Sequence, residues 1–348
     1  MDLTRRAFLA GLAATPVVAA CGGGGDDGGE GARGPTTGAS SSSSETTATT
    51  PPPPPMAPLT GGPFTGDPAV LSRPALVVKI DNLDTNETAR PQAGLNEADI
   101  VFEERTEGGI TRFAAVFHSA DADPVLPVRS ARYTDIEICN LLNRPLFANS
   151  GAAFDVLEAV RASNLVPVGH SDVGNAYFNR VPGRRGPHNL GTSTPLLYSL
   201  TPQGAQPPPP LFSYRAPGTP AAGGVPAGGV HVVYGGGRAQ SPVDHHFDPA
   251  VGGWARFQNG TPHVDTNGVQ VAPANVVVQF IEYAGTTGVL VGGGEAWVFT
   301  GDQLVTGTWH RPDSTTPTAF VDAAGAPIAL LPGRTWILLP PPGGATLQ

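Results

Sequence analysis

Charged side chains gather in residues 90–132 of a chain in which only 14% of residues are charged. The arginines of this stretch are Arg90, Arg105, Arg112, Arg129 and Arg132, and among them lie Glu97, Asp99, Glu103, Glu104 and Glu107. A guanidinium group can bind a phosphate or a carboxylate through two parallel hydrogen bonds. The stretch is therefore expected to bind an anion.

The run 129–132, RSAR, is the most specific candidate, because it falls between a strand-like segment and a predicted helix. The backbone N–H groups of Ser130 and Ala131 are expected to donate to a ligand, and the helix N-terminus adds partial positive charge. His188 and Asn189, from a later loop, are expected to complete a polar cleft beside Arg129 and Arg132.

Four further residues are candidates for binding the same ligand. Asp81 and Asn82 follow an apolar run, and in open α/β sheets ligands bind at the carboxyl ends of strands. Arg90 and Arg112 add two guanidinium groups from the charged stretch.

A purely structural role is the alternative, since opposite charges in one segment usually satisfy each other. The acids available for such a network are Glu103, Glu104, Glu107 and Asp135.

An enzyme is the second alternative. Two strands followed by Pro-Val-Arg-Ser-Ala-Arg and a helix are loosely similar, in arrangement only, to envelope phosphotransferases of the LytR type. Those enzymes move lipid-linked glycan phosphates onto the cell wall. In that arrangement Arg129 and Arg132 would clamp a pyrophosphate, while Asp81 or a neighbouring carboxylate would hold a metal. A hydrolase of lipid-linked glycan phosphates is an alternative of the same class.

Other constellations are weaker. Glu103, Glu104 and Glu107 could be the paired acids of a glycoside hydrolase, but adjacent residues of a strand point to opposite faces. The motif His245-His246-x-Asp248 could bind a metal, yet no HExxH or CxxC motif accompanies it, so a polar loop is expected. Ser130 lacks the Gly-x-Ser-x-Gly elbow of a hydrolase nucleophile. No nucleotide-binding glycine fingerprint occurs either, so neither a metal nor a cofactor is expected.

The first 21 residues are expected to be an export signal, removed from the fold. Arg5 and Arg6 precede an apolar run that is too short, and too broken by Pro16, to span a bilayer. The run TRRAFL resembles a twin-arginine signal, and VAAC, ending at Cys21, resembles a lipobox, whose cysteine is lipidated and becomes the mature N-terminus. An ordinary secretory peptide with a chance cysteine is the alternative, and the general export route also stays open.

Residues 22–72 are expected to form a disordered tether, because their Gly, Ser, Thr and Pro content offers almost nothing to bury. Residues 73–201 then alternate strand and helix patterns, which predicts a mixed α/β domain. Strands are expected at 75–80, 100–104, 112–118 and 145–149, with a hairpin turn at Gly108-Gly109. Helices are expected at 134–143, opened by a Thr134-x-x-Glu137 capping box, and at 152–163, with Phe154, Leu157 and Val160 as its buried stripe; Thr194-Pro195 starts a last short helix.

Residues 202–229 are rich in proline and glycine, which predicts an interdomain linker or a long surface loop. Residues 230–342 carry strand signals and few helix signals, so a small, mainly-β C-terminal domain is expected. Its strands are expected at 231–234, 254–258, 275–283, 295–300, 303–310, 328–331 and 335–339. Core packing is the expected role of Trp254, Trp297, Trp309 and Trp336, although an exposed row of them could stack on sugar rings.

The formal net charge of −9 argues against nucleic acid or an anionic membrane surface as the partner. Once Cys21 carries lipid, Cys139 is the remaining cysteine, so no intramolecular disulfide is expected. Cys139 lies in an apolar helical pattern and is expected to be a core residue rather than a catalytic thiol.

Several motifs resemble a known family. The run RPQAGLNEADIVFEERTEGGITRFAAVFHS, the segment PVRSAR and the later GPHNL look like those of the YerB-like lipoproteins, a bacterial family of domains of unknown function. GEAW, GTW and PGRTW, in the C-terminal part, are similar to the second, β-rich domain of that family. The resemblance covers roughly residues 65–342 and implies a membrane-anchored envelope protein with two domains. It implies no established activity.

The sequence thus predicts an exported protein, anchored by lipid on Cys21 to the outer face of the cytoplasmic membrane. It is expected to bind an anionic or glycan component of the cell envelope, or a protein partner, in an arginine-lined cleft of its first domain. A binding or assembly module is favoured over an enzyme.

Overall fold

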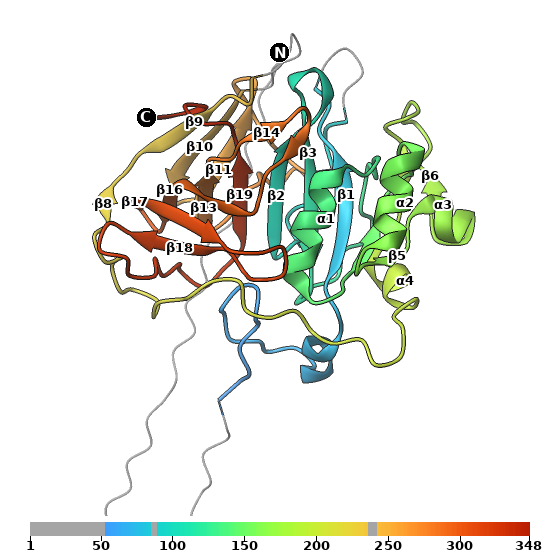
Figure 1. Cartoon of the computed structure of the whole chain (residues 1–348), viewed down its shortest axis with the longest axis horizontal. Helices are drawn as coiled ribbons and strands as arrows, with labels where there is room; N and C mark the ends of the chain where they lie inside the picture. The colour runs from blue at the N-terminus through green and yellow to red at the C-terminus, as the bar shows by residue number, and fades with distance from the viewer. Residues whose placement is uncertain (1–52, 85–88, 236–241) are drawn as a thin grey trace, which may run out of the picture. The chain divides into compact units, whose positions relative to one another are not determined.

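The computed structural model describes residues 53–84, 89–235 and 242–348 (Figure 1). The expected export signal, with Arg5, Arg6 and Cys21, and residues 22–52 of the expected tether lie outside the described residues. Residues 52–348 form one compact unit. No helix within the described ranges is both long enough and apolar enough to cross a membrane.

The α/β part opens with a strand that is buried along its whole length, β1 (Leu76–Asp81), as its apolar run predicts. Next come β2 (Ile100–Arg105) and β3 (Thr111–Phe117), which form an antiparallel hairpin. Gly108 and Gly109 take positive φ in the turn, a conformation that glycine adopts without steric cost. The predicted hairpin is confirmed.

Two helices follow near their predicted positions, α1 (Tyr133–Cys139) and α2 (Phe154–Ala162), with two differences. The box that caps α1 joins Arg132 to Asp135, two residues earlier than the predicted Thr134 and Glu137, and the Thr134 hydroxyl accepts a hydrogen bond from the Gly288 amide. Of the stripe predicted for α2, Val160 is buried, but Phe154 is 78% exposed and Val156 is buried in its place.

The other elements of this part are short. They are η1 (Pro68–Ser72), η2 (Glu107–Gly109), η3 (Asn140–Leu142), β4 (Leu146–Ala148), β5 (Val166–Pro167), α3 (His170–Val173), η4 (Gly174–Ala176), β6 (Asn179–Arg180), β7 (Leu190–Gly191) and α4 (Thr194–Tyr198). Pro195 stands in the first turn of α4, as predicted, where its missing N–H breaks no helical hydrogen bond.

The remainder of the described chain contains strands and no helix. These strands are β8 (Val225–Pro226), β9 (Gly229–Val232), β10 (Val243–Asp248), β11 (Gly253–Gln258), β12 (Thr261–Pro262), β13 (Asn275–Gln279), β14 (Tyr283–Ala284), β15 (Thr287–Gly288), β16 (Gly292–Thr300), β17 (Gln303–Arg311), β18 (Ala319–Asp322), β19 (Thr335–Leu339) and β20 (Ala345–Leu347).

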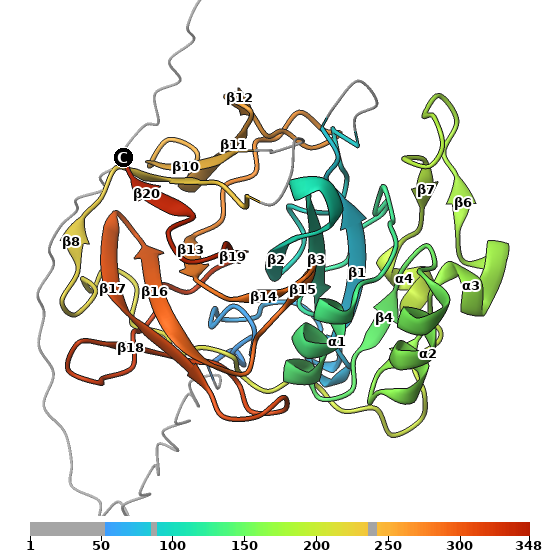
Figure 2. The same cartoon turned by 45° about the horizontal axis from the view of Figure 1, so that its top comes forward.

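One long sheet contains strands from both parts of the chain. Within the described residues it has 11 strands, in the order β18-β17-β16-β13-β19-β2-β3-β1-β4-β5, with β8 paired to β17. The junction is the parallel pairing of β19 with β2, which sets Thr335 beside Ile100 (Figure 2). A late strand of the C-terminal part, β19 (Thr335–Leu339), therefore returns to the first hairpin.

A second, five-stranded sheet, in the order β12-β11-β10-β9-β20, packs against one face of the long sheet. Trp254 of this sheet lies edge-on to Phe299 of the long sheet, with ring centroids 5.1 Å apart. Trp254, Trp309 and Trp336 are buried, as core residues should be, and Trp297 is partly buried. The other face of the long sheet carries α1, whose Ile138 and Cys139 pack with Val77 and Phe102 (Figure 1).

Two segments that were expected to lie outside the core pack against it. Residues 53–72 fall in the expected tether, yet Leu59 is completely buried, because it packs into the same core cluster as Ile138 and Cys139 of α1. Residues 202–229 run over the surface as a long loop that buries Leu211 and Ala221. The Tyr214 hydroxyl in this loop donates a 2.7 Å hydrogen bond to the Leu59 carbonyl, so the two segments hold each other.

The predicted fold class is confirmed: an α/β part is followed by a mainly-β part. Most predicted strands lie within a few residues of their observed bounds, but residues 328–331 form no strand, and β10, β18 and β20 were not predicted. The motif expected to be a polar loop, His245-His246-x-Asp248, lies in β10, where His245 is completely buried. A polar sequence can form a strand when tertiary packing favours it, because only every second side chain of the strand must face the interior.

Candidate functional site

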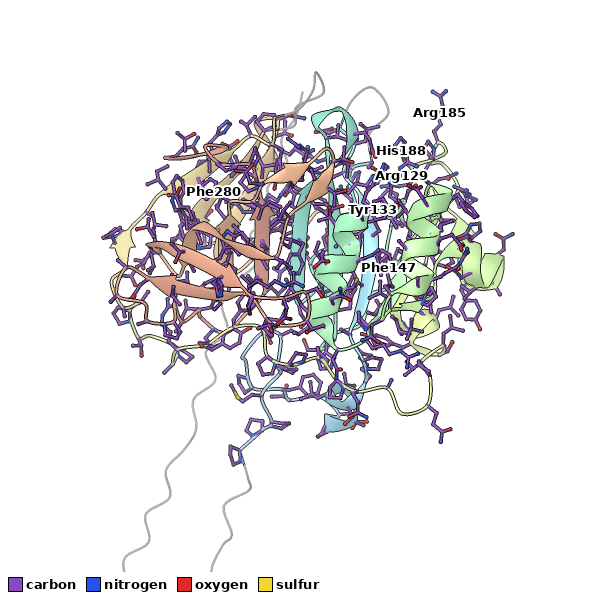
Figure 3. All side chains as sticks on the ribbon, viewed as in Figure 1. Arg129, Tyr133, Phe147, Arg185, His188 and Phe280 are labelled. Atoms are coloured by element: carbon purple, nitrogen blue, oxygen red, sulfur yellow. The ribbon has the colours of Figure 1, made fainter. Side chains whose placement is uncertain are left out.

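Five of the predicted ligand-binding residues meet at one edge of the long sheet. β1 and β4 are parallel, so their carboxyl ends lie side by side, and antiparallel β3 begins at the same edge. We call the group gathered there the arginine surface; its members are Asp81, Arg112, Arg129, Arg132 and His188. Figure 3 shows Arg129 and His188 close together at this edge, with Arg185 extending beyond them.

Asp81 is the centre of the arginine surface. Its side chain is 1% exposed, and one carboxylate oxygen, Oδ2, lies 2.6 Å from His188 Nδ1 and 3.0 Å from Arg129 Nε. The other oxygen, Oδ1, accepts a 3.3 Å hydrogen bond from the Leu83 amide. A single buried carboxylate therefore holds the imidazole and a guanidinium group that is 24% exposed.

Arg132 pairs with the other nearby acid. Its Nε and Nη2 donate to the two oxygens of Glu107, at 2.7 and 2.6 Å, in the forked geometry that suits a carboxylate. Glu107 is 56% exposed, so this pair lies at the rim of the surface and is screened by solvent.

Arg112 has no acid of its own. Its Nη1 donates to the carbonyl of Ser130 at 3.0 Å, and its buried Nε has no hydrogen-bond partner among the described residues. Burial and repulsion from Arg132 and Arg129 together lower the pKa of Arg112 to about 10, although Asp81 and Glu107 oppose the shift. An anion bound here would stabilise the charged form of Arg112.

Glu104 and Asp135 are engaged below the arginine surface by a buried lysine. Lys79, which is completely buried, lies between Glu104 and Asp135, 2.7 Å from Asp135 Oδ1 and in short contact with Glu104 Oε1. Burial raises the pKa of Glu104 to about 7, so a proton on Glu104 leaves this group of three neutral. Of the acids of the structural alternative, Glu104 and Asp135 thus serve Lys79, whereas Glu107 pairs with Arg132 and Glu103 pairs with Arg256.

The loop that carries His188 adds more positive charge. Arg180 donates to the Asn189 side-chain oxygen at 2.8 Å, and Arg184 donates to the carbonyls of Ala89 and Pro91. Among the described residues, Arg112, Arg180 and Arg184 form no ion pair with a carboxylate. On a chain with a net charge of −9, this edge is a local concentration of cations.

The structure places the other predicted ligand-binding residues differently. Asn82 is completely buried and donates to Thr111 at 2.7 Å, inside a hydrogen-bond network beneath the surface. Arg90 is held by Asp84 at 2.8 Å and by the carbonyl of Pro262. Asn189 lies in the His188 loop but uses its side chain on Arg180 and on the carbonyl of Arg184.

The backbone donors expected at 129–132 are only partly available. The Ala131 amide donates to Gly151 at 3.0 Å and is therefore engaged. The Ser130 amide has no acceptor among the described residues. α1 is only seven residues long, and Asp135 already accepts from the first amide of its cap, that of Arg132, so the helix end contributes little.

Two exposed aromatic side chains start α1 and α2; Tyr133 was not considered from the sequence, and Phe154 was expected to be buried. The loops before α1 and α2 are joined by two hydrogen bonds, Ala131 to Gly151 and Ser150 to Arg129, each 3.0 Å long. Tyr133, which is 38% exposed, and Phe154 start these two helices. The exposure of Phe154 could have been predicted from its position in the first turn of the helix, where a side chain can extend beyond the end of the core.

The residues that the sequence made weaker candidates for catalysis, Glu103, Glu104 and Cys139, have structural roles. Glu103 and Glu104 point to opposite faces of β2, as predicted: Glu104 contacts Lys79, whereas Glu103 contacts Arg256 of the second sheet. Cys139 is buried and free, and burial raises the pKa of its thiol well above the usual range, as fits a core residue. No group of three or more metal-binding side chains occurs within the described part of the chain.

Comparison with protein families gives two matches, in chain order. Residues 59–205 match "Protein of unknown function (DUF3048) N-terminal domain", and residues 230–337 match "Protein of unknown function (DUF3048) C-terminal domain". The first match contains every member of the arginine surface.

Individual relatives agree with the family match. The chain is 27% identical, over 297 residues, to the "Putative lipoprotein YerB" of Bacillus subtilis (strain 168), which covers 82% of this chain and 86% of that protein. The crystal structure of the YerB protein from Bacillus subtilis superposes with a TM-score of 0.71 at 26% identity, covering 84% of this chain and 99% of that one.

Proposed function

The chain belongs to the DUF3048 family of proteins of unknown function, with its N-terminal and C-terminal domains in order, and on this premise we propose that it is an exported, lipid-anchored protein that binds an anionic glycan of the cell envelope. The arginine surface is the proposed binding site. The observation that carries the proposal is that Arg112, Arg180 and Arg184 have only neutral partners among the described residues, while Arg129 shares one carboxylate with His188.

A phosphate group is the ligand chemistry that fits best. Burial, and then repulsion from Arg132 and Arg129, destabilises the charged form of Arg112, and a multiply charged anion would counter both effects at three guanidinium groups together. Exposed Tyr133 and Phe154 would stack against a sugar ring attached to the phosphate. Together these features support a sugar phosphate, rather than a simple anion, as the preferred ligand.

Binding is tested by calorimetric titration with pyrophosphate and with glucose 1-phosphate. Arg112→Gln and Arg129→Gln are each expected to weaken both ligands by about 10- to 100-fold, since a charged hydrogen bond contributes roughly 1.5–3 kcal/mol. Tyr133→Ala should weaken glucose 1-phosphate alone. Arg161→Gln is the matched control, because Arg161 pairs with Glu158 and Asp172 at the surface of α2. Equal affinities of wild type, Arg112→Gln and Arg129→Gln for both ligands would contradict the proposal.

The lipid anchor is proposed from the lipobox-like run ending at Cys21 and from the name of the Bacillus subtilis relative. Its acyl chains would hold the protein at the outer face of the cytoplasmic membrane. Cys21→Ser is expected to abolish labelling by radioactive palmitate and to move the protein from the membrane fraction to the soluble fraction. Cys139→Ser, at the buried free cysteine, should keep the label. A Cys21→Ser protein that still incorporates palmitate would exclude this anchor.

An enzyme acting on a glycan phosphate, either a phosphotransferase or a hydrolase, is the second candidate. The specific observation that favours it is the hydrogen bond between buried Asp81 and His188, which a binding site does not require.

A further inference from the structure

We propose that the arginine surface hydrolyses phosphodiesters, with His188 Nε2 as the general base. This inference rests on the proposed function, since the same arginines must first hold the phosphate. It adds a chemical step, the attack of water on a bound phosphodiester, to the binding of an anion.

The position of His188 fixes which nitrogen can accept a proton. The Asp81 carboxylate lies 2.6 Å from Nδ1, so the neutral ring carries its hydrogen on Nδ1 and its lone pair on Nε2. His188 is 4% exposed, and Nε2 has no hydrogen-bond partner among the described residues. A nearly buried imidazole therefore keeps one basic ring atom without a protein partner among the described residues.

The Asp81 carboxylate is fixed in a position that holds the His188 ring in this orientation. Asp81 is the last residue of β1, 1% exposed and flanked by cross-strand Arg112, so its position is set by the core of the sheet. Because Arg129 contacts the same carboxylate oxygen as His188, the guanidinium group and the imidazole are held on one atom. A phosphate that contacts Arg129 would lie next to His188. Asp81 is thus a positioning residue, and His188 would be the catalytic residue.

The proposed step is balanced without a further reactant. His188 Nε2 takes a proton from a water molecule as the water oxygen forms a bond to phosphorus. The bond from phosphorus to the leaving oxygen breaks on the opposite side, that oxygen takes a proton from solvent water, and His188 returns its own proton to solvent. Arg112 and Arg129 hold the non-bridging oxygens, on which negative charge grows in the transition state. One phosphodiester and one water give one phosphomonoester and one alcohol.

The test measures hydrolysis of bis(p-nitrophenyl) phosphate by the full chain, through the release of p-nitrophenolate. His188→Gln is expected to lower kcat by about 10²- to 10⁴-fold, the usual contribution of a general base. In wild type, kcat/KM should rise with pH, because a general base acts in its unprotonated form, and His188→Gln should lack that rise. Asp81→Asn should lower kcat and displace the pH profile, which a loss of folding alone would not do. Arg129→Gln should raise KM and also lower kcat, because Arg129 holds the oxygens on which charge grows in the transition state.

His170→Gln is the matched control, because His170 bonds to Asn175 outside the arginine surface. It should keep the wild-type rate. Equal turnover by wild type and His188→Gln would overturn the inference. So would absence of hydrolysis by a wild-type protein that still binds pyrophosphate in the calorimeter, and the proposed binding function would then stand. A wild-type protein that neither binds pyrophosphate nor hydrolyses the ester would overturn both.

Discussion

Replacing Arg256 by methionine is expected to lower the free energy of unfolding by about 3–5 kcal/mol, because it leaves a buried carboxylate without its cation. Arg256 and Glu103 are both completely buried, and Arg256 Nη2 donates to the two oxygens of Glu103 at 2.9 and 3.0 Å. Trp336 Nε1 also donates to Glu103, at 3.0 Å. Urea unfolding, followed by circular dichroism and by tryptophan fluorescence, measures the loss.

This ion pair joins the two family domains, since Glu103 lies on β2 and Arg256 on β11. We therefore propose that residues 73–201 and 230–342 unfold in one transition, and that both probes report the same midpoint. Glu103→Gln in the Arg256→Met background should recover part of the loss. Arg161→Met, at an exposed ion pair, should cost about 1 kcal/mol or less. A comparable loss from Arg161→Met, or two separate transitions, would contradict the account.

Lys79→Met is expected to have an effect of the same size, about 3–5 kcal/mol at neutral pH, since it leaves Glu104 and Asp135 buried without a cation. Asp135 also accepts a 2.7 Å hydrogen bond from the Arg132 amide, so the substitution should loosen the arginine surface as well. Thermal unfolding monitored by circular dichroism measures the change in stability.

The loss should grow with pH. Burial raises the pKa of Glu104 to about 7, Lys79 opposes this rise and Asp135 adds to it, so removal of Lys79 raises the pKa of Glu104 further. A carboxyl group whose pKa is higher in the folded than in the unfolded state stabilises the fold when protonated. That contribution is complete below the unfolded pKa and is lost as pH rises through the folded pKa. The deficit of Lys79→Met should therefore be larger at pH 8 than at pH 5. A deficit that shrinks as pH rises would contradict the assignment.

Local patterns in the sequence predicted the elements of the fold better than their long-range pairing. The apolar run of β1 and the glycines between β2 and β3 specify a strand and a hairpin through neighbouring residues alone. The pairing of Thr335 with Ile100 depends on contacts between residues far apart in the chain, which no local pattern records. For the same reason, the polar sequence of β10 gave no sign that His245 would be buried between two sheets.

The candidate site shows the same division. The residue types and their spacing indicated an anion site, and the structure brings Asp81, Arg112, Arg129 and His188 together. The bond between Asp81 and His188 could not be predicted, because the two residues are 107 positions apart and meet only when the late loop folds back onto β1. Nor could the interior position of Asn82, since the buried network that contains it includes side chains from the C-terminal part.

The most direct test of the arginine surface is a crystal structure of the protein grown with pyrophosphate. The account predicts that pyrophosphate oxygens lie within hydrogen-bond distance of Arg112 and Arg129, next to His188 Nε2. It would be contradicted by pyrophosphate bound elsewhere on the protein, or by crystals in which these side chains keep only their internal partners and no anion lies beside them.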